Sequence, residues 1–257
     1  MLNFRNTNLC ALGLMILLLV LRLMGLIPGW PLILLSAVYV VLLIYGSYSI
    51  GSGFYFKAAC SVQTTRKEIA ISFDDGPDAA YTADILDILR KEQIPAAFFC
   101  IGSRVDERPD LCRQMMEDGH LIGNHSYSHH FWFDLFSPQK MLADLREMDR
   151  AVKKATGLTP RLFRPPYGVT NPNLKKAVQQ GGYIPVGWNI RSYDTVIKDE
   201  KKLLQKLTAG IRPGAIVLFH DTSPTTRATL PEFIRRVGHE GYRIVRLDKL
   251  LNLVPYA

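Results

Sequence analysis

The sequence contains only four cysteines, and no two of them have the Cys-x-x-Cys spacing. Zinc knuckles and thioredoxin-type redox sites depend on that spacing, so neither is expected here. Lys and Arg form no cluster, although the formal net charge is +8. A dispersed basic excess is typical of an ordinary solvated surface, and we predict no nucleic-acid partner. A disulfide between Cys100 and Cys112 is an alternative to two buried free thiols, and we favour the thiols.

Acidic residues are missing from the first part of the chain, residues 1–59, and its basic residues are Arg5, Arg22 and Lys57. Two apolar runs, 9–27 and 32–50, flank a Pro-Gly-Trp-Pro turn. Each run would form a helix about 28 Å long, close to the hydrocarbon thickness of a bilayer. A signal peptide has a shorter apolar core. We therefore predict a transmembrane hairpin that contacts the bilayer through residues 9–50, with one anchor plus one buried or interfacial segment as the alternative.

The sequence gives only weak evidence for the orientation of this hairpin in the membrane. The turn is uncharged, whereas Arg5 lies before the first run and Lys57, Arg66 and Lys67 lie beyond the second. The positive-inside rule would place both ends, and the domain that follows, in the cytoplasm. These charges are few, so we predict a multi-pass protein of the cell membrane and leave the side of the catalytic domain open.

Strand-like and helix-like segments alternate after Lys67. Expected strands cover residues 69–73, 96–101, 121–123, 162–163, 183–187, 215–219 and 242–245. Expected helices cover residues 82–91, 109–118, 138–155, 173–180, 200–208 and 230–238, with Ser137 as an N-cap. Repeated β-then-α units predict a parallel sheet covered by helices. The polar motifs follow the strands, so we expect the active site at their carboxyl ends.

Two adjacent carboxylates, Asp74 and Asp75, end an apolar strand-like run and precede Gly-Pro. Buried carboxylates are costly unless they are paired or bind a metal. His125 and His129 lie four positions apart, so in a helical turn they would share one face. One carboxylate and two imidazoles form an oxygen and nitrogen ligand set for a divalent metal. The neighbouring His130 leaves a second histidine register open.

Three further motifs also follow expected strands. They are Phe-Arg-Pro-Pro-Tyr-Gly at 163–168, Trp-Asn-Ile-Arg-Ser-Tyr-Asp at 188–194 and Ile-Val-Leu-Phe-His-Asp at 216–221. In this order, the five motifs resemble the polysaccharide deacetylases, carbohydrate esterase family four, over roughly residues 67–250. Members of this family are metal-dependent enzymes that remove N- or O-acetyl groups from sugars. The resemblance implies an α/β fold, a distorted (β/α)7 barrel at 60–257, preceded here by the transmembrane helical hairpin at 1–59.

The resemblance also implies a role for each motif residue. It makes Asp74 the general base, with Arg164 as its partner, and His220 the general acid, oriented by Asp194. The implied metal ligands are Asp75, His125 and His129. We expect one divalent ion, Zn²⁺, with Co²⁺, Ni²⁺ or Mn²⁺ as alternatives.

Three residues of these motifs correspond to the substrate side of the site. The backbone N–H of Tyr167 corresponds to the family's oxyanion donor, and Leu218 resembles a residue that lines the acetyl pocket. Trp188 either walls that pocket or packs in the core. The family usually has tryptophan after the aspartate at 194, whereas this chain has Thr195, which leaves the shape of the substrate site open.

An aromatic run follows the histidines, with Phe131, Trp132, Phe133 and Phe136. We expect these rings to pack in the core. A surface that stacks on sugar or touches the bilayer is the alternative.

The predicted activity is metal-dependent hydrolysis of N-acetyl groups in a glycan that contains N-acetylglucosamine, such as peptidoglycan or a chitin-like polymer. A glycosidase needs carboxylates on opposite sides of the scissile bond, which adjacent Asp74 and Asp75 do not provide. A non-catalytic sugar-binding protein would be expected to lack a ligand, base or acid. The alternative is a deformylase or deacetylase of a lipid-linked sugar precursor at the cytoplasmic membrane face. We predict no protein partner.

Overall fold

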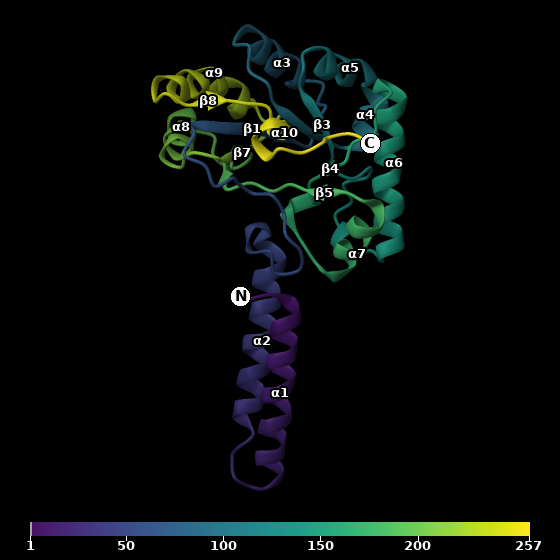
Figure 1. Cartoon of the computed structure of the whole chain (residues 1–257), viewed down its shortest axis with the longest axis vertical. Helices are drawn as coiled ribbons and strands as arrows, with labels where there is room; N and C mark the ends of the chain where they lie inside the picture. The colour runs from purple at the N-terminus through teal and green to yellow at the C-terminus, as the bar shows by residue number, and fades with distance from the viewer. Residues whose placement is uncertain (1) are drawn as a thin grey trace.

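The computed structural model describes residues 2–257, and an α-helical hairpin projects from its α/β domain (Figure 1). The hairpin consists of α1 (Phe4–Leu23) and α2 (Trp30–Tyr48). Both helices are long and apolar enough to cross a membrane, with mean hydropathies of 1.8 and 2.0. Only 6% of either apolar window is buried within the protein. The side chains of the hairpin therefore form an apolar surface rather than a core.

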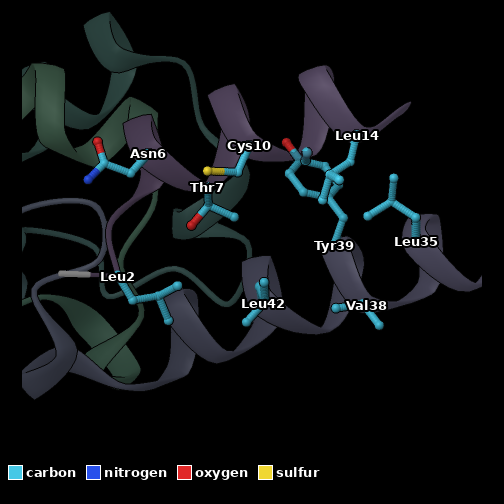
Figure 2. A pocket seen from close by; sticks show the side chains of 10 residues that line it. Leu2, Asn6, Thr7, Cys10, Leu14, Leu35, Val38, Tyr39 and Leu42 are labelled. Atoms are coloured by element: carbon cyan, nitrogen blue, oxygen red, sulfur yellow. The ribbon is translucent and has the colours of Figure 1, made fainter. Parts of the chain in front are cut away.

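A shallow groove on one face of the hairpin illustrates this surface. Figure 2 shows side chains of both helices around it, with Cys10 and Leu14 from α1 and Leu35, Tyr39 and Leu42 from α2. The groove has a volume of about 370 Å³. A hydrogen bond from the Tyr39 hydroxyl to the Asn8 side chain, 3.0 Å long, ties the two helices together.

Within the described residues, seven parallel strands follow one another across the sheet in the order β5-β4-β3-β2-β1-β7-β6. The strands are β1 (Glu68–Asp74), β2 (Ala97–Cys100), β3 (Leu121–Asn124), β4 (Leu162–Phe163), β5 (Ile184–Pro185), β6 (Ile190–Arg191) and β7 (Ile216–His220). A further strand, β8 (Arg243–Ile244), pairs with the start of β1. The curved, incomplete barrel confirms the predicted distorted (β/α)7 fold. The segment after the hairpin lies along the sheet, because backbone bridges join Ala59 to Val186, just after β5, and Ser61 to Ala215, just before β7.

Helices cover the outer face of the sheet (Figure 1). They are α3 (Thr82–Lys91), α4 (Gly102–Glu107), α5 (Pro109–Glu117), α6 (Pro138–Thr156), α7 (Pro172–Gly181), α8 (Glu200–Ala209) and α9 (Pro224–His239). The short α10 (Leu247–Leu251) packs on the opposite face, where its leucines lie against Ala70 and Phe99. Ser137 caps α6 as predicted by accepting a hydrogen bond from the Lys140 N–H. The start predicted for α9 was wrong by six residues, because Ser223 caps the helix earlier and Pro231 lies inside it.

The two faces of the central strands differ in polarity. Phe73 of β1 stacks between Phe98 and Phe219 on the helix-covered face, with ring centroids 4.9 and 5.6 Å apart. Strand side chains alternate between faces, so Ser72 and Asp74 point into the barrel. Packing of the Phe73 ring on the helix-covered face thus fixes the positions of Ser72 and Asp74 on the barrel face. Cys100 and Cys112 are both buried free thiols, as expected.

The hairpin and the domain are joined by specific contacts. Thr170 is buried, and it donates hydrogen bonds to the carbonyls of Gly46 and Ser47 at the end of α2. The ring of Phe54 lies against Gly46 so closely that a Cβ there would be 2.1 Å from Phe54 Cδ1. The end of α2 is therefore packed directly on the segment that follows the Arg-Pro-Pro-Tyr-Gly motif.

Candidate active site

Polar side chains gather at the carboxyl ends of β1 and β7. The Cα atoms of Asp74 and His220 are register partners on these neighbouring strands. Because parallel strands end at one edge, this pairing brings a carboxylate and an imidazole to the same side of the sheet. The motifs after β3 and β4 reach the same edge, since Asn124 of β3 pairs with Phe163 of β4.

The backbone at Asp75 explains how adjacent carboxylates serve one site. Successive strand residues point to opposite faces, so a longer strand would separate Asp74 from Asp75. The strand ends at Asp74, and Asp75 has a φ of 78° in the left-handed region. Such a conformation costs free energy for a residue with a Cβ and is concentrated at functional sites. The turn brings Asp75 within reach of His125 and His129.

Asp75, His125 and His129 form a cluster whose ligand atoms all lie within 4.8 Å of one another. The Nε2 atoms of both histidines are 3.4 Å from Oδ1 of Asp75. Ligands about 2.0–2.1 Å from a tetrahedral Zn²⁺ are about 3.3 Å apart, so these separations suit one divalent ion. His125 Nδ1 lies 2.8 Å from the carbonyl of Arg164, which holds the proton on Nδ1 and leaves Nε2 free to bind an ion. The donor set therefore fits a divalent metal.

The same cluster perturbs the pKa values of its members. Burial disfavours the charged imidazole of His129 and lowers its pKa to about 4, with a further contribution from His125. Burial has the same effect on His125, but Asp74 and Asp75 outweigh it and raise the His125 pKa. Burial opposes ionisation of Asp75, whereas the hydrogen bond and charge of His125 lower its pKa. An ionised carboxylate and a neutral imidazole are the protonation states that bind a metal.

The histidines do not lie in a helical turn, and that expectation was wrong. Residues 125–130 form an irregular loop after β3, with φ values of 66° at Ser126 and 42° at His129. Asp144 of α6 holds this loop by accepting hydrogen bonds from the Tyr127 N–H at 2.7 Å and from the Ser128 hydroxyl at 2.6 Å. The loop turns both imidazoles toward Asp75. His130 is exposed and lies against the ring of Phe136 instead.

Arg164 is fully buried beside Asp74. Its Nη1 donates to Asp74 Oδ1 at 2.7 Å and to the Ser72 hydroxyl at 2.9 Å. The remaining guanidinium nitrogens donate to the carbonyls of Val186 and Gly187, and the ring of Phe99 lies 4.0 Å from the guanidinium carbon. Burial lowers the pKa of Arg164. A buried guanidinium in which each nitrogen donates at least one hydrogen bond holds the Asp74 carboxylate in one orientation.

His220 and Asp194 form a second buried pair. The Nδ1 of His220 lies 2.7 Å from Asp194 Oδ1, and the His220 N–H donates to Asp194 Oδ2. Asp194 also accepts hydrogen bonds from the hydroxyls of Ser192 and Thr226. Burial disfavours the imidazolium, but the hydrogen bond and charge of Asp194 outweigh it and raise the His220 pKa to about 9. His220 is therefore cationic at neutral pH and able to give up a proton.

Tyr167, Trp188 and Leu218 lie around these groups. Tyr167 has a φ of 58°, and its ring is 4.7 Å from that of His129. Trp188 is half-buried and packs on Gly168, where a Cβ would lie 2.6 Å from the indole. Val217 and Phe219 belong to the helix-covered core, so alternation points Leu218 toward the same face as His220. All ten predicted site residues thus meet at one end of the barrel.

Two features near the site differ from expectation or refine it. Phe131 and Trp132 are 68% and 55% exposed, so the expected core packing of the aromatic run was wrong for these two rings. Phe133 is buried, as expected. Thr195 is exposed and leaves the Asp194 carboxylate in place, because its own N–H donates to Asp194.

Sequence reasoning missed the residues that hold the motif side chains in place. They are Ser72, Asp144, Ser192 and Thr226. Ser72 and Ser192 lie within the motifs, which is the only signal that could have indicated them. Asp144 and Thr226 lie on helices, and only the tertiary structure brings them to the site.

Comparison with known sequences identifies relatives of this chain. The sequence profile described as polysaccharide deacetylase matches residues 61–186. A peptidoglycan-N-acetylglucosamine deacetylase of Bacillus cereus is 34% identical over 196 residues, which cover 74% of this chain and 91% of that protein. A peptidoglycan-N-acetylglucosamine deacetylase of Listeria monocytogenes is 34% identical over 186 residues, covering 72% of this chain. This chain spans only 39% of the length of the Listeria protein.

The structure has a counterpart among solved structures. The peptidoglycan deacetylase PdaC of Bacillus subtilis superposes with a TM-score of 0.69 at 31% identity. The match covers 74% of this chain and 93% of that structure.

Proposed function

Because the chain belongs to the polysaccharide deacetylase family, we propose that it is a metal-dependent hydrolase that removes N-acetyl groups from a glycan containing N-acetylglucosamine. The named substrates of its relatives favour peptidoglycan over a chitin-like polymer. The observation that supports this proposal most is the meeting of Asp74, the Asp75-His125-His129 cluster and the His220–Asp194 pair at one barrel end.

In this proposal, Asp74 is the general base. It takes a proton from the water that attacks the acetyl carbon, and Arg164 keeps its carboxylate directed toward that water. Asp75, His125 and His129 would hold the divalent ion, which supplies Lewis-acid activation of the carbonyl and of the water when bound. We expect Zn²⁺ in this role, since the donor set is one carboxylate and two imidazoles.

His220 is the proposed general acid. An amide nitrogen is a poor leaving group unless it is protonated, and the cationic imidazole of His220 provides the proton. Asp194 sustains the positive charge of His220 and fixes the ring through Nδ1, which leaves Nε2 to face the substrate. The proposed base and acid are register partners on neighbouring strands, so both would lie beside the same scissile bond.

The backbone N–H of Tyr167 is the proposed donor to the developing oxyanion. Donors fixed in position before the reaction stabilise such a charge more strongly than water does. Leu218 and Trp188 would form the apolar walls around the acetyl methyl group. Leu218 points to the same face of β7 as His220, and Trp188 packs on Gly168 beside Tyr167, which supports this assignment.

We also propose that α1 and α2 both span the cell membrane and anchor the domain at its surface. Trp30 lies at one end of α2 and Tyr45 and Tyr48 at the other, all at least 50% exposed. At 1.5 Å per residue, Trp30 and Tyr48 are roughly 27 Å apart. Aromatic residues at both ends of an apolar helix are typical of the two membrane interfaces.

The anchor supports a second candidate function, the deacylation of a lipid-linked sugar precursor. The end of α2 contacts Thr170, three residues after Tyr167, so the proposed site lies close to the membrane surface. The chemistry is the same, and only the substrate differs.

Acetate release distinguishes the two candidates. The full-length protein in detergent is given N-acetylated chitooligosaccharides, peptidoglycan fragments or a lipid-linked acetylated sugar. We expect release from the glycans, loss of activity on chelation and recovery with added divalent metal. Activity on the lipid-linked sugar alone would favour the second candidate, and inactivity on every substrate would refute deacetylation in both.

A further inference from the structure

Three exposed apolar side chains lie beside the end of the hairpin. Phe131, Trp132 and Leu135, which we call the apolar rim, are 68%, 55% and 69% exposed. They belong to the segment between the metal-cluster loop and α6. A soluble surface carries scattered apolar residues, but a contiguous set of large ones usually marks an interaction site.

The apolar rim is continuous with the hairpin. A hollow of about 350 Å³ is lined by Tyr48 of α2 together with the apolar rim, Asp134, Tyr167 and Val169. A second hollow lies between Leu135 and the last six residues of α2, with Leu43, Ile44 and Tyr48 on its wall. The domain therefore reaches down beside the final turns of α2, and α7 lies at the same level in Figure 1.

This position sets the depth of the apolar rim relative to a bilayer. If α2 spans the hydrocarbon core, its last turns lie at the boundary between hydrocarbon and headgroups. Leu135 lies beside residues 43–48 and must lie at the same boundary. Large apolar side chains are favoured at that depth, whereas in water they would remain exposed at a cost.

The charges around the apolar rim suit a membrane surface. Exposed basic residues lie on α1, on the segment after α2, on α6 and on α7, at Arg5, Lys57, Lys140, Lys175 and Lys176, while Asp134 lines both hollows at the apolar rim. Within residues 2–257, none of the five makes an ion pair with an acidic side chain. Lys140 lies over the ring of Phe136, 3.6 Å from its centroid. Basic side chains around an inserted apolar patch add attraction to anionic lipid headgroups.

We propose that the apolar rim inserts into the headgroup layer of the same bilayer that α1 and α2 span, so that the active site opens at the membrane surface. This inference rests on the proposed membrane anchoring. The ring of Phe131 lies 6.5 Å from that of Tyr167, which in turn contacts His129. The membrane-facing surface and the candidate active site are therefore one side chain apart.

Tryptophan fluorescence tests the proposal, because the chain has three tryptophans in different places. The full-length protein is reconstituted in phosphatidylcholine vesicles with a minority of phosphatidylglycerol and with lipids brominated near the headgroup. Trp30→Phe removes the hairpin signal, and Trp30→Phe with Trp132→Phe leaves Trp188 alone. We expect the Trp132 contribution, taken as the difference, to be blue-shifted and mostly quenched, while half-buried Trp188 is not quenched.

The outcomes separate the proposals. If Trp30 is quenched but Trp132 is not, the hairpin is in the bilayer and the insertion of the apolar rim is refuted. If neither is quenched, the anchoring fails and the insertion fails with it. Because quenching needs no turnover, it is independent of the proposed deacetylase activity.

A paired activity measurement excludes a sugar-stacking surface. Trp132→Ser with Leu135→Ser should leave acetate release from soluble chitooligosaccharides in detergent unchanged. When the same double variant also carries Phe131→Trp as a fluorescence probe, bromolipid quenching of that probe should be lost. Val254→Ser, which removes an exposed apolar residue near the C-terminus, is the matched control. If the KM for the soluble sugar rises in the double variant but not in Val254→Ser, the proposal is overturned.

Discussion

Asp74 and His220 are register partners across β1 and β7, and each is paired with its own buried counter-charge. Arg164 contacts Asp74 and Asp194 contacts His220, both at 2.7 Å. Two oppositely charged groups at neighbouring strand ends would otherwise pair with each other. The separate partners keep the proposed base and the proposed acid available within one site.

Replacing the proposed base should remove activity while the metal is retained. Asp74→Asn keeps the size of the side chain and a hydrogen-bond acceptor for Arg164. General base catalysis contributes roughly 10²- to 10⁴-fold, so acetate release should fall by about that factor. Asp87→Asn, which alters an exposed carboxylate on α3, should have near-normal activity. Loss of metal from Asp74→Asn, or near-normal turnover, would show that its role is assigned wrongly.

The two adjacent histidines, His129 and His130, allow a sharp test of the ligand set. Purified protein is stripped with a chelator, reloaded with Zn²⁺ and analysed for metal content. We expect one ion per chain in the unaltered protein and in His130→Ala, whose imidazole faces Phe136. His125→Ala and His129→Ala each remove one of three ligands and should bind little metal. Full metal content in His125→Ala would contradict the assignment.

The His220–Asp194 pair predicts a pH dependence. The pKa of His220 is raised to about 9, so the imidazole is protonated below that value and activity should fall as the pH rises through it. A bound cation offsets the charge of Asp75, which places the alkaline limb of kcat/KM at or below about pH 9. Asp194→Asn removes the hydrogen bond and charge that contribute most to raising the His220 pKa, so the alkaline limb of kcat/KM in this variant should move to lower pH. A limb at the same pH in Asp194→Asn would contradict the role of Asp194.

The same shift affects stability with a definite sign. A histidine whose pKa is raised by folding stabilises the protein fully below its unfolded pKa of about 6.5. That contribution is lost as the pH rises through about 9. Denaturant titrations of the metal-free protein should therefore show a smaller difference between the unaltered chain and His220→Gln at high pH. A difference that grows with pH would contradict this linkage.

The contact between hairpin and domain depends on a glycine. A Cβ at Gly46 would lie 2.1 Å from the Phe54 ring, so Gly46→Ala forces the ring or the helix to move. Overpacking of this kind typically costs about 1–3 kcal/mol. We expect a lower Tm in detergent and faster proteolysis of the segment between α2 and β1. Gly13→Ala adds the same methyl group to α1 in open space and should change neither.

Much of the fold was predictable because it depends on local periodicity. The apolar runs, Ser137 as a helix cap and the short β-then-α repeats indicated the two long helices and the parallel barrel. The missed elements are short or ambiguous. β6 has two residues and α10 has five, and Pro231 concealed the first turns of α9.

The candidate site divides in the same way. The sequence alone indicated which side chains form the candidate site, since carboxylates and imidazoles are recognisable by type and spacing and the motif order resembles the family. Only the tertiary structure decided the loop geometry of His125 and His129, because hydrogen bonds from the loop to the Asp144 carboxylate on α6 set it. It also decided that Phe131 and Trp132 are exposed, because burial depends on which element packs over a ring and not on the ring itself. Chemical identity is a property of single residues, whereas orientation and exposure are properties of contacts between segments far apart in the chain.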